Sequence, residues 1–151
     1  MNIIIRVASS SDAALIAEFN AALAMETENL DLDRERVRKG TEALLADSSK
    51  GIYHLAEVDG KIVGQLMITY EWSDWRNATF WWIQSVYVLP EYRNRGVFRY
   101  LYQSIESLAR KRGDICGLRL YVDTSNTHAQ QTYEALGMRR SHYQIMDVEF
   151  S

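Results

Sequence analysis

Apolar and polar positions along the chain recur with two different periods, and these periods predict the order of strands and helices. The apolar run at residues 2–7 predicts a first strand, and apolar positions spaced for one helical face predict helices over residues 9–25 and 33–46. Two apolar stretches then flank Asp59 and Gly60, a pair typical of a tight type I′ turn, so residues 51–72 are predicted to form a β-hairpin.

The second half of the chain begins with a strand at residues 78–90 that is apolar on both faces, which favours a central place in a sheet. A helix is predicted over residues 97–112, a strand over 116–123, a short helix over 126–138 and a last strand over 141–150. This order, β-α-α-β-β-β-α-β-α-β, predicts an α+β fold. Its mixed, mostly antiparallel sheet is flanked by about four helices, and a strand–helix–strand crossover comes late in the chain.

Composition narrows the class of protein. The 151 residues include one proline, Pro90, and no Gly/Ser-rich linker, which favours a single domain over residues 1–151. The formal net charge of −3 argues against a nucleic-acid-binding surface, and no apolar run is long enough to cross a membrane. The short apolar N-terminal stretch, interrupted by Arg6, is not expected to be a signal peptide. The three histidines lack metal-ligand spacing, so no metal site is predicted.

The single cysteine, Cys116, allows no intrachain disulfide and is expected to fill the core of a cytoplasmic protein.

A short basic turn joins the strand at residues 78–90 to the helix that follows it. This turn contains Arg93, Arg95 and Gly96, and Arg99 follows in the first helical turn. The first amides of a helix lack an internal partner and carry the positive end of its dipole, so such a turn can bind an oxyanion. The segment has neither a nucleotide-triphosphate loop nor a dinucleotide fingerprint. By itself, the pattern is better explained by a solvated loop than by a phosphate site.

Two motifs together change that interpretation. Residues 85–102 resemble the coenzyme A-binding motif of the GNAT superfamily of N-acetyltransferases, in which a strand and a proline precede Arg or Gln, two residues, Gly, one residue, and Gly or Ala. The matching positions are Val86, Val88, Pro90, Arg93 and Gly96. Phe98 departs from the motif, since the family usually has a small residue there. A later family signature is matched at its three-, four- and four-residue steps by Asn126, Ala129, Tyr133 and Gly137.

The resemblance implies a GNAT-like acyl-CoA N-acyltransferase fold and acetyl-CoA (coenzyme A) as the cofactor. In this family the central strand separates from its neighbour, and unpaired backbone groups, here at residues 84–88, hold the pantetheine arm and the thioester carbonyl. The N–H of Val86 would stabilise the oxyanion of a tetrahedral intermediate, and the turn at residues 93–99 would hold the pyrophosphate. The implied cofactor-binding residues are Ser85, Val86, Tyr87, Val88, Arg93, Asn94, Arg95, Gly96, Val97, Phe98, Arg99, Asn126 and Tyr133.

Tyr133 matches the tyrosine that protonates the departing thiolate in this family. A reference pKa of about 10, above about 8.5 for a thiol, keeps such a tyrosine protonated and able to donate. The alternative is that Tyr133 only packs against the cofactor or the core. Asn126 would contact the cofactor arm or a water, or would simply cap the helix that follows it.

The acceptor amine must lose a proton before it attacks, and a carboxylate is the usual base. The candidate bases are Glu26, Glu28, Glu71 and Asp74. Glu71 and Glu28 are preferred, although a solvated surface role is the commoner fate of a single carboxylate. Carboxylates beside aromatic rings suit an organic cation. The candidate substrate-binding residues are Glu26, Glu28, Trp72, Asp74 and Trp75, with both tryptophans expected in a loop. Trp81 and Trp82, inside a strand, are expected to pack in the core or in a dimer interface.

These observations predict an N-acetyltransferase that moves an acetyl group from acetyl-CoA to a primary amine of a small or amino-acid-like molecule by direct attack. Three alternatives stay open: a protein lysine or N-terminal acetyltransferase, a non-catalytic acyl-CoA sensor, and a chain whose cofactor site is blocked by Phe98. A homodimer is compatible with the fold and with the aromatic residues.

Overall fold

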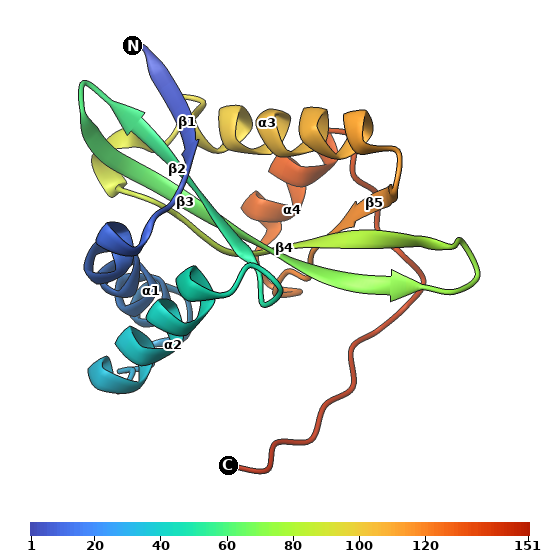
Figure 1. The fold of residues 1–151 in the computed structure, drawn as a ribbon, viewed down its shortest axis with the longest axis horizontal. Helices are drawn as coiled ribbons and strands as arrows, with labels where there is room; N and C mark the ends of the chain where they lie inside the picture. Colours follow the sequence, from blue (N-terminus) through green and yellow to red (C-terminus); the bar gives the residue numbers. More distant parts are fainter. The chain divides into compact units, whose positions relative to one another are not determined.

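The computed structural model describes residues 1–151, which form two compact units, Met1–Leu120 and Tyr121–Ser151. The single-domain prediction stays a prediction. The first unit contains β1 (Ile3–Val7), α1 (Ala13–Glu28), α2 (Arg34–Ala46), β2 (Ile52–Val58), β3 (Lys61–Ser73), β4 (Ala78–Val88), α3 (Val97–Arg112) and β5 (Ile115–Arg119), as Figure 1 shows. The second unit contains α4 (Thr127–Ala135).

The five strands form one sheet in the order β1-β2-β3-β4-β5, which is also their order along the chain. The first four strands pair antiparallel, and β5 pairs parallel to β4 after the α3 crossover. Asp59 and Gly60 both have positive φ, as a type I′ turn requires, so the predicted hairpin turn is confirmed. The predicted mixed, mostly antiparallel sheet flanked by helices is also confirmed.

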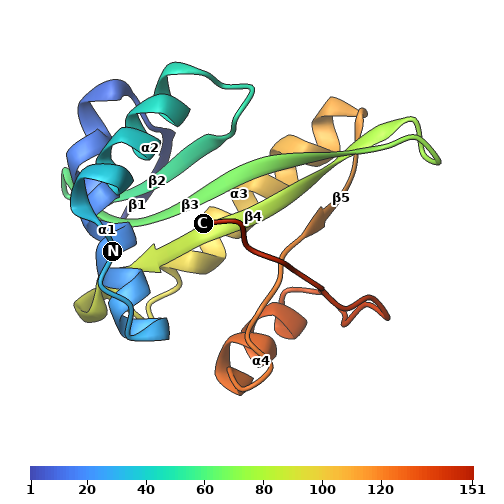
Figure 2. The same ribbon diagram turned by 90° about the horizontal axis from the view of Figure 1, so that it is seen from below.

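Helices cover both faces of the sheet in the first unit. In the two views of Figures 1 and 2, α3 lies along one face, while α1 and α2 lie on the other. The α3 face holds fully buried Leu101 and Ile105 of the helix, whose apolar positions repeat as a buried helical stripe requires. On the α1 face, Ile16 packs against Tyr53 and Leu55 of β2. These two apolar layers fix the position of β3 and β4 between them.

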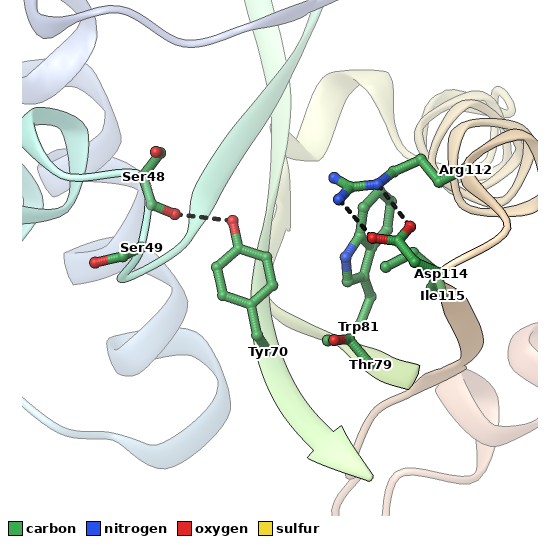
Figure 3. Close-up of a pocket in the computed structure, with 8 residues that line it drawn as sticks. All are labelled: Ser48, Ser49, Tyr70, Thr79, Trp81, Arg112, Asp114 and Ile115. Atoms are coloured by element: carbon green, nitrogen blue, oxygen red, sulfur yellow. Dashed lines mark hydrogen bonds and ion pairs between the residues drawn. The ribbon is translucent and has the colours of Figure 1, made fainter. Parts of the chain in front are cut away.

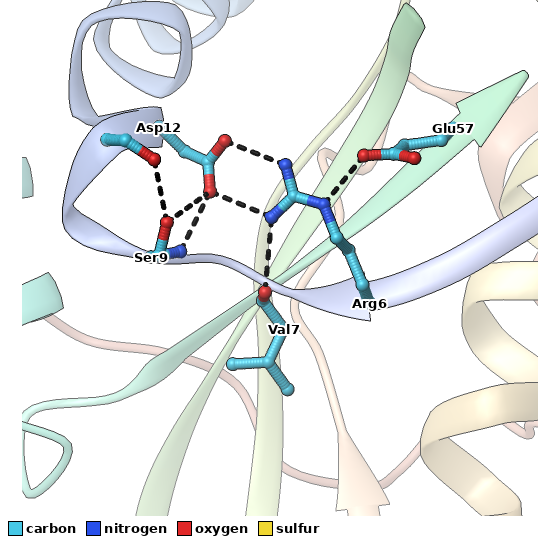
Figure 4. Close-up of polar contacts among 6 residues, drawn as sticks. Arg6, Val7, Ser9, Asp12 and Glu57 are labelled. Carbon is cyan, nitrogen blue, oxygen red and sulfur yellow. Dashed lines mark hydrogen bonds and ion pairs between the residues drawn. The ribbon is translucent and has the colours of Figure 1, made fainter. Parts of the chain in front are cut away.

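An ion-pair network ties β1 to the start of α1 (Figure 4). Arg6 donates from its two terminal nitrogens to the Asp12 carboxylate at 2.9 and 2.8 Å, and from Nε to Glu57 Oε1 at 2.6 Å. Asp12 also accepts from the backbone N–H of Ser9 at 2.8 Å. The bonds from Arg6 lower the pKa of Asp12 to about 2, so its carboxylate stays charged although it is nearly buried.

Two strand predictions are wrong. The strand expected at residues 116–123 ends at Arg119, because β4 pairs with β5 only as far as Trp82 opposite Arg119. The last strand expected at residues 141–150 does not form. Alternating apolar residues indicate which side chains share a face, but a strand also needs a neighbour for its backbone groups. No strand pairs with residues 141–150, and Met146 and Phe150 there are each 94% exposed.

Two side-chain predictions also need correction. Cys116 is exposed rather than a filler of the core, because it lies on β5, the last strand of the sheet, which has a neighbour on one side only. Trp72 lies within β3 opposite Thr79 rather than in a loop. Trp81 is buried, as predicted, whereas Trp82 is only half-buried and hydrogen-bonds Glu71.

No helix of this structure is long and apolar enough to cross a membrane.

Candidate functional site

The edge of β4 that faces β5 is left unpaired over the second half of the strand. Pairing with β5 ends at Trp82, whereas β4 continues to Val88 and stays paired with β3 on its other side. Residues 83–88, named here the open edge, amount to about 20 Å of strand. The open edge includes the segment for which the sequence predicted unpaired backbone groups, and it offers them to a ligand lying alongside.

A β-bulge interrupts the open edge. Gln65 of β3 lies opposite Tyr87 and Met67 lies opposite Gln84, so one residue of β3 faces the two residues Ser85 and Val86. Ser85 has a φ of 52°, in the left-handed region that non-glycine residues rarely adopt. Bulges re-aim backbone and side chains beside active sites. The strained residue therefore lies where the thioester carbonyl was predicted.

The basic turn follows β4 and leads into α3. Asn94 and Gly96 have positive φ values of 62° and 85°. Gly96 is the N-cap residue of α3, so no N-cap side chain occupies the first amides of the helix. α3 begins at Val97, and the first amides of a helix have no hydrogen-bond partner within the helix itself. Together with the helix dipole, this turn is suited to an anion.

Arg93 has a different environment from the other arginines of the turn. Its Nε donates to the carbonyl of Val88 at 2.9 Å, and its NH2 donates to Glu26 Oε1 at 2.7 Å. Arg95 and Arg99 are exposed and take part in no ion pair. Arg93 therefore joins the turn to β4 and α1, and the charge available to a ligand comes from Arg95 and Arg99.

Glu26, at the end of α1, contacts both the turn and the open edge. The Tyr87 hydroxyl donates to Glu26 Oε2 at 2.6 Å, and the ring lies beneath the guanidinium of Arg93, 5.4 Å from its carbon. The bond from Tyr87, with that from Arg93, lowers the pKa of Glu26, while burial and the Glu26 carboxylate raise the pKa of Tyr87 to about 12. Glu26 is therefore a charged carboxylate that holds two predicted cofactor residues.

Glu71 lies at the other end of the open edge. Its Oε1 accepts from the Trp82 indole at 2.7 Å and from Arg119 of β5 at 3.1 Å, and these bonds lower its pKa. The guanidinium of Arg119 stacks over the ring of Phe80 at 3.6 Å. The structure thus places one candidate carboxylate beside the last β4–β5 pair, and Arg119 is a partner that the sequence reasoning missed.

The remaining acceptor candidates lie elsewhere. Trp72 is 61% exposed near the tip of the β3–β4 hairpin, and Trp75 is 88% exposed in its turn, where its backbone N–H donates to Asp74 Oδ1. Glu28 is exposed at the last position of α1. The structure does not gather these residues with Glu71, and their contact with an acceptor stays a prediction.

Asn126 and Tyr133 belong to the second unit. Asn126 Oδ1 accepts from the backbone N–H of Ala129 at 3.1 Å, so it caps α4, as one of the two sequence-based interpretations expects. Tyr133 lies in the second turn of α4, and burial raises the pKa of its hydroxyl. The raised pKa agrees with a tyrosine that stays protonated at neutral pH.

A cavity of about 330 Å³ lies on the first unit at the C-terminal end of α3 (Figure 3). It is remote from the basic turn, since the 16 residues of α3 span about 24 Å. Its charged groups and its one phenol are already paired: Tyr70 donates to the Ser48 carbonyl at 2.9 Å, and Arg112 donates twice to Asp114. The cavity therefore offers no unpaired charge to a ligand.

Comparison with known proteins gives one family. The sequence profile of the Acetyltransferase (GNAT) family matches residues 17–138. A possible acetyltransferase from Clostridium difficile 630 is 48% identical, with a TM-score of 0.93 over 100% of this chain and 99% of that one. Thialysine N-epsilon-acetyltransferase from Bos taurus is 30% identical over 148 residues, 89% of this chain and 83% of the bovine protein.

A predicted acetyltransferase from Clostridium acetobutylicum, solved with acetyl-CoA, has a TM-score of 0.79 over 97% of this chain and 96% of that one. At 15% identity, this likeness concerns the fold alone.

Proposed function

Because the chain belongs to the GNAT acetyltransferase family, we propose that it moves an acetyl group from acetyl-CoA to the primary amine of a small, amino-acid-like molecule. One observation carries the proposal: β4 loses its β5 partner just before a bulge at Ser85, and the same strand then leads into a glycine turn at the start of α3. A thioester and a pyrophosphate joined by a flexible arm need this succession of sites. The bovine relative, named for acetylation of thialysine, supports an amino-acid-like acceptor.

The residues of the first unit fit acetyl-CoA, which when bound supplies an acetyl group activated as a thioester. The open edge, with Ser85, Val86, Tyr87 and Val88, would hold the pantetheine arm through backbone groups. The N–H of Val86 would donate to the acetyl carbonyl oxygen as negative charge develops there.

In the turn, the amides following Gly96 and the side chains of Arg95 and Arg99 would bind the pyrophosphate. Arg93 would keep the turn in place, because its donors are already directed at Val88 and Glu26. Phe98 lies 6.2 Å from the Tyr102 ring, centroid to centroid, so its side chain packs along α3, and its backbone N–H is at the helix start.

The candidate catalytic carboxylates would act on the acceptor amine. The bonds that Glu71 accepts from Trp82 and Arg119 keep it ionised and also make it a weaker base. Its role in the proposal is to attract and orient the ammonium form of the acceptor, and the proton leaves to water. On this basis, Glu71→Gln raises KM for the amine more than it lowers kcat, whereas loss of a general base lowers kcat.

Tyr133 would return a proton to the leaving thiolate. Its pKa lies above the ordinary tyrosine value because the side chain is partly buried, so the hydroxyl is protonated at pH 7. Tyr133→Phe should then reduce kcat sharply and leave coenzyme A affinity nearly intact. Normal turnover by this variant would eliminate the acid role.

Release of free thiol from acetyl-CoA, measured across amino acids, diamines, polyamines and aminoglycosides, tests the proposal as a whole. Turnover with a lysine-like amine supports it. Acetylation of peptide lysines or N-termini, with no small amine accepted, assigns the chain to protein acetylation instead. Acetyl-CoA binding without turnover on any amine identifies a sensor. A melting temperature unchanged by acetyl-CoA shows that the cofactor site is lost, because a ligand that binds only the native state must stabilise it.

A further inference from the structure

A chain of side-chain amides connects the bulge on β4 to α1. Gln65 of β3 is completely buried, and its Nε2 donates to the backbone carbonyl of Ser85 at 3.0 Å and to Asn20 Oδ1 at 3.1 Å. Asn20 Nδ2 in turn donates to the hydroxyl of Tyr53 at 2.9 Å. Three elements, α1, β2 and β3, therefore fix the direction of one carbonyl on β4.

This arrangement is unfavourable for stability on its own. The second polar atom of the same side chain, Gln65 Oε1, is buried without a hydrogen-bond partner. A buried acceptor left unpaired is destabilising, and this cost offsets part of what the two bonds from Nε2 contribute to stability. The left-handed φ of Ser85 adds backbone strain at the same point. Both costs fall on one bulge, so a role other than stability accounts for Gln65.

The geometry of the peptide bond between Ser85 and Val86 indicates what that role is. The carbonyl of Ser85 and the N–H of Val86 belong to the same planar trans peptide and point in opposite directions. Gln65 holds the carbonyl from the β3 side of β4. We therefore expect the N–H of Val86 to point away from Gln65 and β3, toward the side of β4 that has no strand partner.

We propose that Gln65 is the positioning residue of the acetyl-transfer site: by binding the Ser85 carbonyl it aims the N–H of Val86 at the open edge, where the acetyl carbonyl is expected, and Asn20 holds Gln65 in place. This inference rests on the proposed function for the contact between Val86 and the thioester. It does not depend on which amine is the acceptor. Gln65 itself touches neither the cofactor nor the reacting atoms.

The test compares Gln65→Leu, which removes the bond to the bulge, with Thr69→Val. The Thr69 hydroxyl accepts from Gln84, so this control also removes one side-chain hydrogen bond between β3 and β4, but leaves the bulge carbonyl held. Removal of a complete oxyanion donor costs about 100- to 1,000-fold in kcat, so a misdirected donor should cost about 10- to 100-fold. Gln65→Leu is expected to lose that much kcat, while its melting temperature, its coenzyme A affinity and its KM for acetyl-CoA stay close to wild type. Thr69→Val is expected to keep its kcat.

A second readout needs no turnover. In ¹⁵N-labelled protein without ligand, Gln65→Leu should shift the amide resonance of Val86, and Thr69→Val should not. In the wild type, acetyl-CoA should slow hydrogen exchange at the Val86 amide more than coenzyme A does, because only the thioester offers the acetyl carbonyl. This comparison keeps the proposal open to refutation even if Gln65→Leu fails to fold, because a Val86 amide that does not face the acetyl group needs no positioning residue.

The outcomes separate the two proposals. Unchanged kcat and an unchanged Val86 resonance in folded Gln65→Leu would overturn the positioning role, as would equal protection of Val86 by acetyl-CoA and coenzyme A. Loss of kcat together with melting temperature and coenzyme A affinity would show that Gln65 is merely structural. A wild type that transfers acetyl to no amine, yet shows the Val86 effects, would refute the proposed reaction and keep the positioning role.

Discussion

Substitutions of Gly96 separate two effects at the start of α3: the strain of a left-handed backbone and the close approach of coenzyme A. Its φ of 85° lies in the left-handed region, and a Cβ added there would meet only the Tyr100 ring, at 3.9 Å. Space is therefore available, and the cost of Gly96→Ala comes from the backbone alone, about 1–2 kcal/mol for an L-residue in this conformation. For a protein of this size, that cost lowers the melting temperature by about 2–8 °C. Gly96→Asn should cost less, since asparagine tolerates left-handed backbone better than alanine does.

The affinity for coenzyme A tests the second effect, the close approach of the ligand to the backbone at Gly96. If the backbone at Gly96 lies against the pyrophosphate, any Cβ intrudes on the ligand, and both variants should bind coenzyme A at least about tenfold more weakly, or about 1.4 kcal/mol. Thermal unfolding without ligand and calorimetric titration with coenzyme A measure the two effects separately. Wild-type stability of Gly96→Ala would refute the backbone argument, and wild-type affinity of both variants would refute the close approach.

Three further predictions concern charge. Asp12→Asn should lower the free energy of unfolding by about 2 kcal/mol at pH 7, because the pKa of Asp12 falls from 3.8 to about 2 in the folded state and each pKa unit is worth about 1.36 kcal/mol. The difference between the variant and wild type in urea titrations should persist above pH 4 and vanish as the pH falls to about 2; a difference that survives there would contradict the ion-pair account. Burial lowers the pKa of His54 to about 4 from 6.5, so the unfolded state binds that proton first. The free energy of unfolding of the wild type should therefore decrease as the pH is lowered from about 6.5 to 4, and His54→Gln should remove this part of the pH profile. Arg99→Ala should weaken coenzyme A binding and reduce its salt dependence with no change in melting temperature, whereas Arg93→Ala should also lower the melting temperature.

The fold was predictable wherever a local pattern determines an element. Apolar periodicity predicted the order of elements up to α4, and Asp59 with Gly60 predicted the hairpin turn, because turn chemistry is local. The same reasoning failed at residues 141–150 and at Cys116. Periodicity states which side chains share a face, and it does not state whether a neighbouring strand or helix is present to cover them.

The candidate site divides in the same way. The strand, the turn and the helix start are contiguous in sequence, so the motif around Gly96 was visible there. The contacts that hold this motif in place join distant residues: Arg93 reaches Glu26 across 67 positions, and Arg119 reaches Glu71 across 48. Gln65 gave no signal at all, because a polar residue in an apolar strand gains its meaning only from the register shift that places it beside Ser85.

The strand order has a consequence for how the molecule reaches its native state. β2, β3 and β4 form a meander joined by two short turns, so its pairings are local in sequence, and such contacts close quickly with little loss of chain entropy. Parallel pairing of β5 must wait for the α3 crossover. A slip of one residue between β3 and β4 would exchange the two faces of the sheet, and the bulge at Ser85, held by Gln65, admits only one alignment. We therefore expect the bond from Gln65 to Ser85, which aims the Val86 amide, to fix the register of β3 and β4 in a folding intermediate or transition state, before any ligand can bind.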